Sequence, residues 1–175
     1  DGISLVDPDS LEFVEFNDAA CTGLGYERTE FAGLSLADVQ ATLTRDELRT
    51  HVAEVLVSGG GEYKVEHLCK SGRIRMTRVG VRVVIVHGHP YLALIWTDIT
   101  EQEQVDAAMN ALRQRFQLAF QSSPLAASIA RFEDGCFVDV NEKYTRDFGW
   151  ERDELLGRSS VDIGLWADAE ERQCW

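Results

Sequence analysis

Four histidines are the side chains in this sequence best suited to bind a metal or to hold a haem iron. His87 and His89 flank a single glycine, whereas His51 and His67 stand alone. Two imidazoles in one tight turn leave a zinc or copper site incomplete, because such sites take three or four protein ligands. We therefore expect a solvated turn at residues 87–90 and no metal site.

Cysteine chemistry and enzyme motifs are not indicated either. The cysteines at positions 21, 69, 136 and 174 have no CxxC spacing, so neither a thiolate zinc site nor a disulfide framework is expected. The sequence also lacks the glycine-rich phosphate loop and the HExxH and GxSxG patterns of common enzyme classes. We expect no catalytic residue in this chain.

The charge of the chain excludes several classes of partner. Its 175 residues include 17 Lys and Arg against 30 Asp and Glu, a formal net charge of −13. Such acidity repels nucleic acid and anionic lipid, and no apolar run approaches the ~20 residues that cross a bilayer. We expect a cytoplasmic location, no nucleic-acid partner and no direct membrane contact. Because the sequence starts with Asp rather than Met, we also expect a fragment of a longer protein.

The sequence contains an internal repeat, which indicates how its helices and strands are grouped into domains. Asn17 and Asn141 lie 124 residues apart (141 − 17). Eight positions match in this register without a gap: Asn17, Gly25, Glu27, Arg28, Glu30, Gly33, Ser35 and Asp38. We therefore expect two copies of one domain. Trp175 is the counterpart of His51 (175 − 124), so the second copy contains only the first half of the domain.

The first copy begins with a hairpin and two short helices. Alternating residues at 3–7 and 12–16 flank a turn at Pro8–Ser10. Asn17 can cap a helix over residues 18–24. Another short helix is expected at residues 29–32.

A longer helix and three strands complete the first copy. The helix should start at Thr44, which fits a capping box with Glu47, and it should end at Ser58 before three glycines. Three strands are expected next, at residues 62–69, 73–86 and 91–98. This order predicts an α+β domain, in which an antiparallel sheet carries its helices on one face.

Residues 101–123 form a helical connector. Thr100 and Glu103 fit a capping box, so the helix should begin directly after the last strand. Its apolar positions alternate in spacings of four and three: Val105, Met109, Leu112, Phe116 and Ala119. This pattern is typical of a coiled-coil seam and predicts a homodimer through the helix. An amphipathic helix folded back on its own domain would show the same stripe, and both interpretations stay open.

These features together resemble the PAS domain family of sensory modules. The resemblance rests on Asn17–Tyr26, Glu30–Gly33, the hairpin region from Gly59 to Gly72, and Asp98–Glu101. Residues 1–100 resemble a complete PAS domain, and residues 124–175 resemble the N-terminal part of a second one. The resemblance implies a five-stranded antiparallel sheet that often encloses a ligand or cofactor pocket. It also implies flanking helices that pass a conformational signal to an output domain.

The resemblance places the pocket between the sheet and the helices. Trp96 stands two residues before Asp98, at a position that faces the pocket in the family, and it shares a strand face with Leu94. Its indole could stack on a flat ligand or simply fill the cavity. The expected pocket residues are Trp96, Leu94, Met76, Val52, Leu48 and His51.

Two cofactors of the family can be compared with the residues present. Neither copy contains the motif that carries the flavin-reactive cysteine of light-sensing members. His51 lies on the long helix that supplies the axial histidine of haem-binding members, about one turn nearer the helix end than that ligand. We expect no cofactor, and a haem- or flavin-binding redox or gas sensor stays open as an alternative.

The function implied by the resemblance is signal sensing and dimerisation within a larger bacterial signal-transduction protein. The parent would be of the sensor histidine kinase or diguanylate cyclase type. Binding of a small molecule or a partner would act on the junction formed by Asp98, Thr100 and Glu101, and the linker helix would carry the change to a downstream output domain. The main alternative is a ligand-free structural spacer whose pocket is packed shut by Trp96.

Overall fold

The computed structural model of the chain describes residues 1–164. Residues 165–175, which include Cys174 and the end of the expected second copy, lie outside the described part. The chain divides into two compact units, Asp1–Asp106 and Ala107–Trp175.

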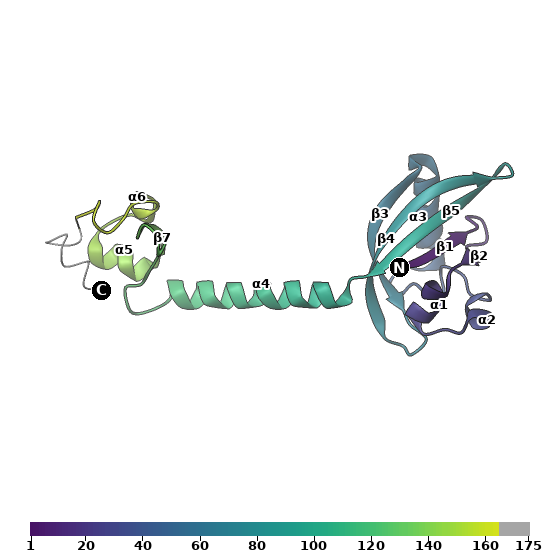
Figure 1. The fold of residues 1–175 in the computed structure, drawn as a ribbon, viewed down its shortest axis with the longest axis horizontal. Helices are drawn as coiled ribbons and strands as arrows, with labels where there is room; N and C mark the ends of the chain where they lie inside the picture. Colours follow the sequence, from purple (N-terminus) through teal and green to yellow (C-terminus); the bar gives the residue numbers. More distant parts are fainter. Residues whose placement is uncertain (165–175) are drawn as a thin grey trace. The chain divides into compact units, whose positions relative to one another are not determined.

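The first unit is built on a five-stranded antiparallel sheet, as predicted (Figure 1). The strands are β1 (Gly2–Val6), β2 (Phe13–Phe16), β3 (Gly60–Leu68), β4 (Ile74–Val86) and β5 (His89–Asp98). Their order across the sheet is β2-β1-β5-β4-β3, so the first and last strands of the domain are neighbours at its centre.

Three helices precede β3, and local caps set their ends. They are α1 (Asp18–Leu24), α2 (Arg28–Phe31) and α3 (Arg45–Ser58). The Oδ1 atom of Asn17 accepts the Ala20 N–H at 3.0 Å, and Gly25 ends α1 in the left-handed region at φ +82°. The predicted capping box of α3, Thr44 with Glu47, is present. A second box, Glu27 with Glu30, starts α2 one residue earlier than expected.

The helices pack on one face of the sheet. Leu48, Val52 and Val55 of α3 are buried with inward residues of β4 and β5, such as Val79 and Leu94. At the other end of the core, the fully buried Phe31 of α2 contacts three aromatic rings at centroid distances of 4.6–6.1 Å. This packing confirms the predicted α+β arrangement with helices on one face.

The β4–β5 hairpin is tighter than the sequence predicted. His87 and Gly88 both have positive φ angles, 51° and 82°, which is the signature of a two-residue turn that matches strand twist. Strand β5 therefore starts at His89, two residues earlier than expected. His89 therefore lies in β5 rather than in the turn, and its side chain is 42% exposed, with Nε2 3.0 Å from Oδ2 of Asp7.

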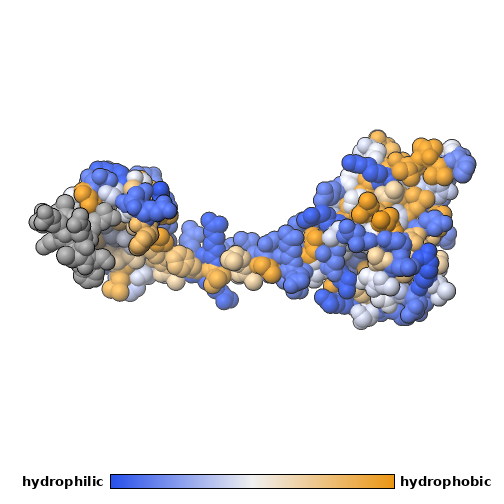
Figure 2. Space-filling view, viewed as in Figure 1, coloured by the Kyte–Doolittle hydropathy of each residue, from blue (hydrophilic) through white to orange (hydrophobic). Residues whose placement is uncertain are grey.

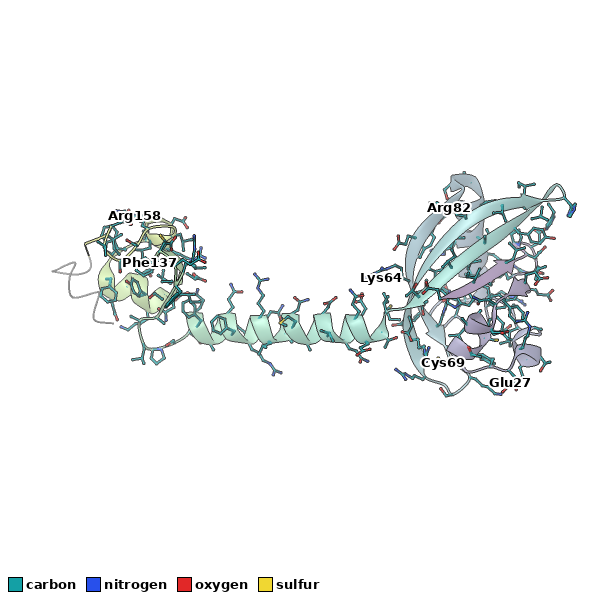
Figure 3. The ribbon with its side chains drawn as sticks, in the orientation of Figure 1. Glu27, Lys64, Cys69, Arg82, Phe137 and Arg158 are labelled. Atoms are coloured by element: carbon teal, nitrogen blue, oxygen red, sulfur yellow. The ribbon has the colours of Figure 1, made fainter. Side chains whose placement is uncertain are left out.

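The second unit repeats the beginning of the first. Helix α4 (Thr100–Gln121) leads to β6 (Ser128–Ala130), β7 (Phe137–Val140), α5 (Glu142–Phe148) and α6 (Arg152–Leu155). Oδ1 of Asn141 accepts the N–H groups of Ala127 and Tyr144, both at 2.9 Å. Oδ1 of Asn17 accepts the N–H groups of Ile3 and Ala20, which stand at the same offset. Phe137 lies in a separate small core of this unit (Figure 3).

Candidate functional site

An apolar cavity of about 80 Å³ lies between α3 and the inner face of the sheet. Four of the expected pocket residues line it: Leu48, His51, Val52 and Leu94. Val79 and Val81 of β4 and Leu92 of β5 form the opposite wall. The cavity is therefore enclosed by the same helix and strands that the sequence singled out.

Two polar side chains in the cavity wall carry unsatisfied atoms. His67 is 1% exposed, and within the described residues its Nδ1 atom has no hydrogen-bond partner. The same holds for the Oε1 atom of Gln40, a residue whose backbone pairs with that of His67 in an isolated bridge. Each of these two atoms exposes less than 1 Å², so neither is open to the cavity, and an unpaired buried polar atom destabilises the fold.

Burial also decides the charge of His67. Loss of solvent lowers the pKa of His67 from 6.5 to about 4, so the imidazole is neutral near pH 7. His51, by contrast, is exposed on α3, and its Nδ1 atom lies 2.9 Å from the carbonyl oxygen of Glu47. The two histidines of the cavity therefore differ in burial, and His67 is its buried polar group.

Two of the expected pocket residues lie elsewhere. The described lining of the cavity does not include Trp96, although its side chain is only 5% exposed. The indole packs on Gly2, because a Cβ atom added to this glycine would lie 1.8 Å from Nε1 of Trp96. Met76 lies an odd number of residues before Val79 on β4, so it points to the opposite face of the sheet. The expectation that Met76 lines the interior is therefore wrong.

The cavity does not fit haem or flavin. Pockets for drug-sized ligands measure roughly 300–1,000 Å³, whereas this one holds about 80 Å³. Its wall places His51 at the exposed side with one ring nitrogen at a backbone carbonyl. The residues present thus do not support the alternative of a haem or flavin sensor.

The junction between β5 and α4 is tied to β4 by side chains. The Oγ1 atom of Thr100 accepts the Met76 N–H at 3.0 Å, and Oδ1 of Asp98 accepts the Thr100 N–H at 2.9 Å. Oδ2 of Asp98 also lies 3.1 Å from Nη1 of Arg75. Burial alone would raise the pKa of Asp98, but the hydrogen bonds from Thr100 and the charge of Arg75 hold that pKa below its usual value.

The capping box predicted at this junction is wrong. The hydroxyl of Thr100 is occupied by the Met76 backbone, and the carboxylate of Glu103 reaches Lys64 of β3, with Oε1 2.6 Å from Nζ (Figure 3). The N–H of Glu103 instead donates to the carbonyl of Ile99 at 2.9 Å. Glu101, the third expected relay residue, is exposed at the start of α4.

The apolar stripe of α4 is uncovered in the single chain. Val105, Met109, Leu112 and Phe116 are 57–63% exposed, and Ala119 is exposed as well. No residue of α4 is buried, and apolar residues show along the helix in Figure 2. An exposed stripe of this kind is what a coiled-coil seam requires. No helix among residues 1–164 has both the length and the apolar content to span a bilayer.

His89 belongs to a cluster that sequence spacing did not reveal. Ligand atoms of Asp7, Asp9 and His89 lie within 4.8 Å of one another. Oδ1 of Asp7 already accepts the N–H groups of Asp9 and Ser10, at 3.0 and 2.9 Å. The contacts of Asp7 therefore stabilise the β1–β2 turn and connect it to the start of β5.

His67 and Gln40 line the cavity but are not among the pocket residues expected from the sequence. A signal for His67 was present, because Tyr63, Val65 and His67 alternate along β3 and all three line the cavity. Gln40 gave no such signal, since it lies in a loop that the structure brings to the edge of β3.

The burial of His67 predicts a pH dependence of stability. Its folded-state pKa of about 4 lies below the unfolded value of 6.5, so the unfolded chain takes up the proton first. The contribution to stability is complete above pH 6.5 and is lost as the pH falls toward 4. We expect the free energy of unfolding, measured with urea, to decrease by about 2 kcal/mol between pH 7 and pH 5 from this group.

The variant His67→Phe should remove that part of the profile, whereas His51→Gln, at an exposed position, should retain it. A wild-type profile that is flat between pH 7 and pH 5 would show that His67 is not buried in the neutral form.

The class of protein now follows from the fold and the cavity. A central five-stranded antiparallel sheet, covered on one face by short helices that enclose a small cavity, makes the first unit an α+β domain. The PAS domain family matches residues 1–101 and 125–175, and the chain belongs to this family.

Two curated relatives are sensors. The sensor histidine kinase TmoS of Ectopseudomonas mendocina is 30% identical over 128 residues, which are 71% of this chain and 13% of that protein. The methyl sulfide methyltransferase-associated sensor of Methanosarcina acetivorans is 18% identical over 175 residues, which are 99% of this chain and 18% of that protein. The chain thus spans less than a fifth of the length of either relative.

Solved structures show the same fold. The PAS domain of an HTR-like protein from Haloarcula marismortui superposes with a TM-score of 0.53 at 21% identity, covering 57% of this chain and 81% of that one. A PAS domain from Desulfitobacterium hafniense gives a TM-score of 0.52 at 18% identity, covering 56% and 92%.

Proposed function

We propose that this chain is a signal-sensing and dimerisation module of a larger cytoplasmic signal-transduction protein, of the sensor histidine kinase or diguanylate cyclase type. The domain of residues 1–100 receives a small ligand or a partner. Helix α4 passes the change to a downstream output domain. We expect no catalytic group in this chain. The sensor names of both curated relatives support the sensing role.

The observation that carries the proposal is that the cavity and the junction share two strands. Val79 and Val81 of β4 line the cavity, and Met76 of the same strand holds Thr100. On β5, Leu94 lines the cavity, and Asp98 lies four residues further along at the junction. A shift of β4 against β5 on ligand binding would therefore change the hydrogen bonds that anchor α4. Such a relay needs a ligand that prefers one of two packings.

Dimerisation through α4 is the second part of the proposal. The four large apolar residues of the seam are more than half exposed, and their four-three spacing matches a two-stranded coiled coil. Pairing two such helices would bury the stripe and join the two junctions into one unit.

The second unit is proposed to be the N-terminal part of another PAS domain. Its two-stranded sheet, its Asn141 cap and its α6 capping box repeat those of the first unit at one offset. A two-stranded hairpin is marginal alone in water, so we expect residues 124–164 to need further contacts for stability.

A ligand-free spacer is the second candidate function. The small size of the cavity and the burial of Trp96 favour it. A spacer would dimerise in the same way, but changes at the junction would not alter the response of an output domain.

Thr100→Val tests the relay. Valine keeps the shape but loses the bond to the Met76 N–H, so the first turn of α4 should open more often. We expect amide hydrogen exchange at residues 100–103 to become about tenfold faster. In the parent protein, the response of the output domain to its stimulus should fall.

The matched control is Thr97→Val, three residues earlier on β5, whose hydroxyl donates to Asp1 rather than to β4. Faster exchange in Thr100→Val with an unchanged output response would contradict the relay and favour the spacer.

A further inference from the structure

We propose that a second pocket, at the end of the sheet where α4 begins, binds a small zwitterion of the α-amino acid class. We call it the junction pocket. It lies between α1 and the ends of β1, β4 and β5, and its lining includes Gly2, Gly23, Arg75, Thr77, Trp96 and Asp98. Its role in signalling rests on the proposed function, whereas its capacity to bind a ligand rests on the pocket alone.

The junction pocket is large enough for such a molecule. Its volume is about 470 Å³, and pockets for drug-sized ligands measure roughly 300–1,000 Å³. A Cβ atom added to Gly23 would meet no atom within 4 Å, so α1 leaves space at this position. Ala19 and Leu24 of the same helix also line the pocket and offer apolar surface to a short aliphatic side chain.

Two buried donors in the pocket wall have no partner. Thr77 is 3% exposed and Trp96 is 5% exposed. Within the described residues, the hydroxyl of Thr77 and the indole N–H of Trp96 make no hydrogen bond, yet neither is enclosed to below 1 Å² of exposed surface. An indole N–H can only donate, so a ligand that satisfies it must bring an acceptor oxygen.

The strand register places the two donors near a cation. Thr77 pairs with Asp98, and Trp96 stands two residues before Asp98 on β5, so Thr77 and Trp96 are diagonal neighbours on the inward face of the sheet. Arg75 stands two residues before Thr77 on β4 and therefore shares this face. A carboxylate has two acceptor oxygens and can accept from both donors beside the guanidinium of Arg75.

The acidic residues of the pocket require a positive group on the same ligand. Asp1 and Asp98 both line it, and the side chain of Asp98 is 41% exposed. These carboxylates would repel a simple anion. A simple cation would be repelled by Arg75 and would leave the indole N–H of Trp96 unpaired. An α-amino acid avoids both costs, because its carboxylate meets the donors while its ammonium group meets Asp98.

A ligand in this pocket would act directly on the start of α4. Oδ1 of Asp98 accepts the Thr100 N–H at 2.9 Å, and Oδ2 of Asp98 lies 3.1 Å from Nη1 of Arg75. The ammonium group of the ligand would compete with Arg75 for the Asp98 carboxylate. Binding would therefore alter the contacts of a residue that anchors α4.

The test is an NMR titration of the isotope-labelled chain with L-valine, isovalerate and isobutylamine. Isovalerate is valine without its ammonium group, and isobutylamine is valine without its carboxylate. We expect L-valine to shift the Trp96 indole N–H signal saturably, with a Kd of about 1 mM. The Trp150 indole N–H, in the second unit, should not shift. Isovalerate and isobutylamine should bind at least about tenfold more weakly, because each leaves a charged or buried group unpaired.

Thr77→Val keeps the shape of the side chain, removes its hydroxyl and should weaken L-valine binding about tenfold. Thr50→Val is the matched control, because the hydroxyl of Thr50 donates to the Asp46 carbonyl on α3, outside the pocket, and it should leave the Kd unchanged. Trp96→Phe is a second variant of the same site, with the same expected loss, measured at the Gly23 amide.

Equal binding of L-valine and either analogue would overturn the assignment of a zwitterion. The absence of a saturable shift with L-valine, or an unchanged Kd in both Thr77→Val and Trp96→Phe, would overturn the site. None of these results bears on the relay, since binding is measured without a signalling readout. Conversely, a Thr100→Val variant with unchanged output would contradict the proposed function even if L-valine binds.

Discussion

Leu112→Asp is expected to convert the chain from a dimer into a monomer. Leu112 is at the middle of the α4 seam and is 63% exposed in the single chain. In a paired coiled coil, its replacement would bury one carboxylate from each helix with no cationic partner at the seam. We expect the dimer dissociation constant to increase about 100-fold or more. Light scattering and sedimentation equilibrium over a range of concentrations would measure it.

Gln114→Asp is the control, because residue 114 lies on the opposite side of the helix from residue 112. It adds the same charge and should leave the dissociation constant within a few-fold of the wild-type value. If Leu112→Asp and the wild type have the same mass in solution at every concentration, then α4 is not the dimer seam.

Phe31→Ala should cause the largest loss of stability in the first unit. Phe31 is fully buried, and its ring lies 4.6 Å from that of Phe13 and 4.9 Å from that of Phe16. Alanine would leave a cavity in a cluster that joins α2 to the β1–β2 hairpin. We expect the free energy of unfolding to fall by about 3–5 kcal/mol, as measured by urea denaturation followed by tryptophan fluorescence.

Phe132→Ala removes the same side chain at a position that is 103% exposed. Its effect should stay within about 0.5 kcal/mol, because no packing is lost. A similar small effect for Phe31→Ala would mean that the α2 segment does not pack on the sheet in solution.

Local patterns were reliable where short-range physics decides the structure. Asn17, Thr44 and Gly25 mark helix ends because their side chains or their backbone freedom satisfy the groups exposed there. The 124-residue repeat predicted the place of Asn141, and the structure gives that residue the same pair of backbone donors as Asn17.

The predictions from local patterns were wrong where a residue far away in the sequence binds the same side chain. Thr100 fits a capping box with Glu103, but Met76 lies 24 residues away in sequence and takes its hydroxyl, and Lys64 takes the carboxylate. Met76 points outward although an interior position is expected for it, and β4 has apolar residues on both faces, such as Val79 inward and Ile74 outward. Alternation alone does not show which face is buried when both are apolar.

The sequence by itself determined the helices, the strands, the antiparallel α+β class and the apolar stripe of α4, because each depends on residues that are close together in the chain. Only the tertiary structure decided which polar side chains line the cavity. Gln40 meets His67 because a loop closes the edge of β3, a contact between residues 27 positions apart (67 − 40) that no local periodicity encodes. The neutral state of His67 has the same origin, since desolvation depends on every segment that surrounds the ring.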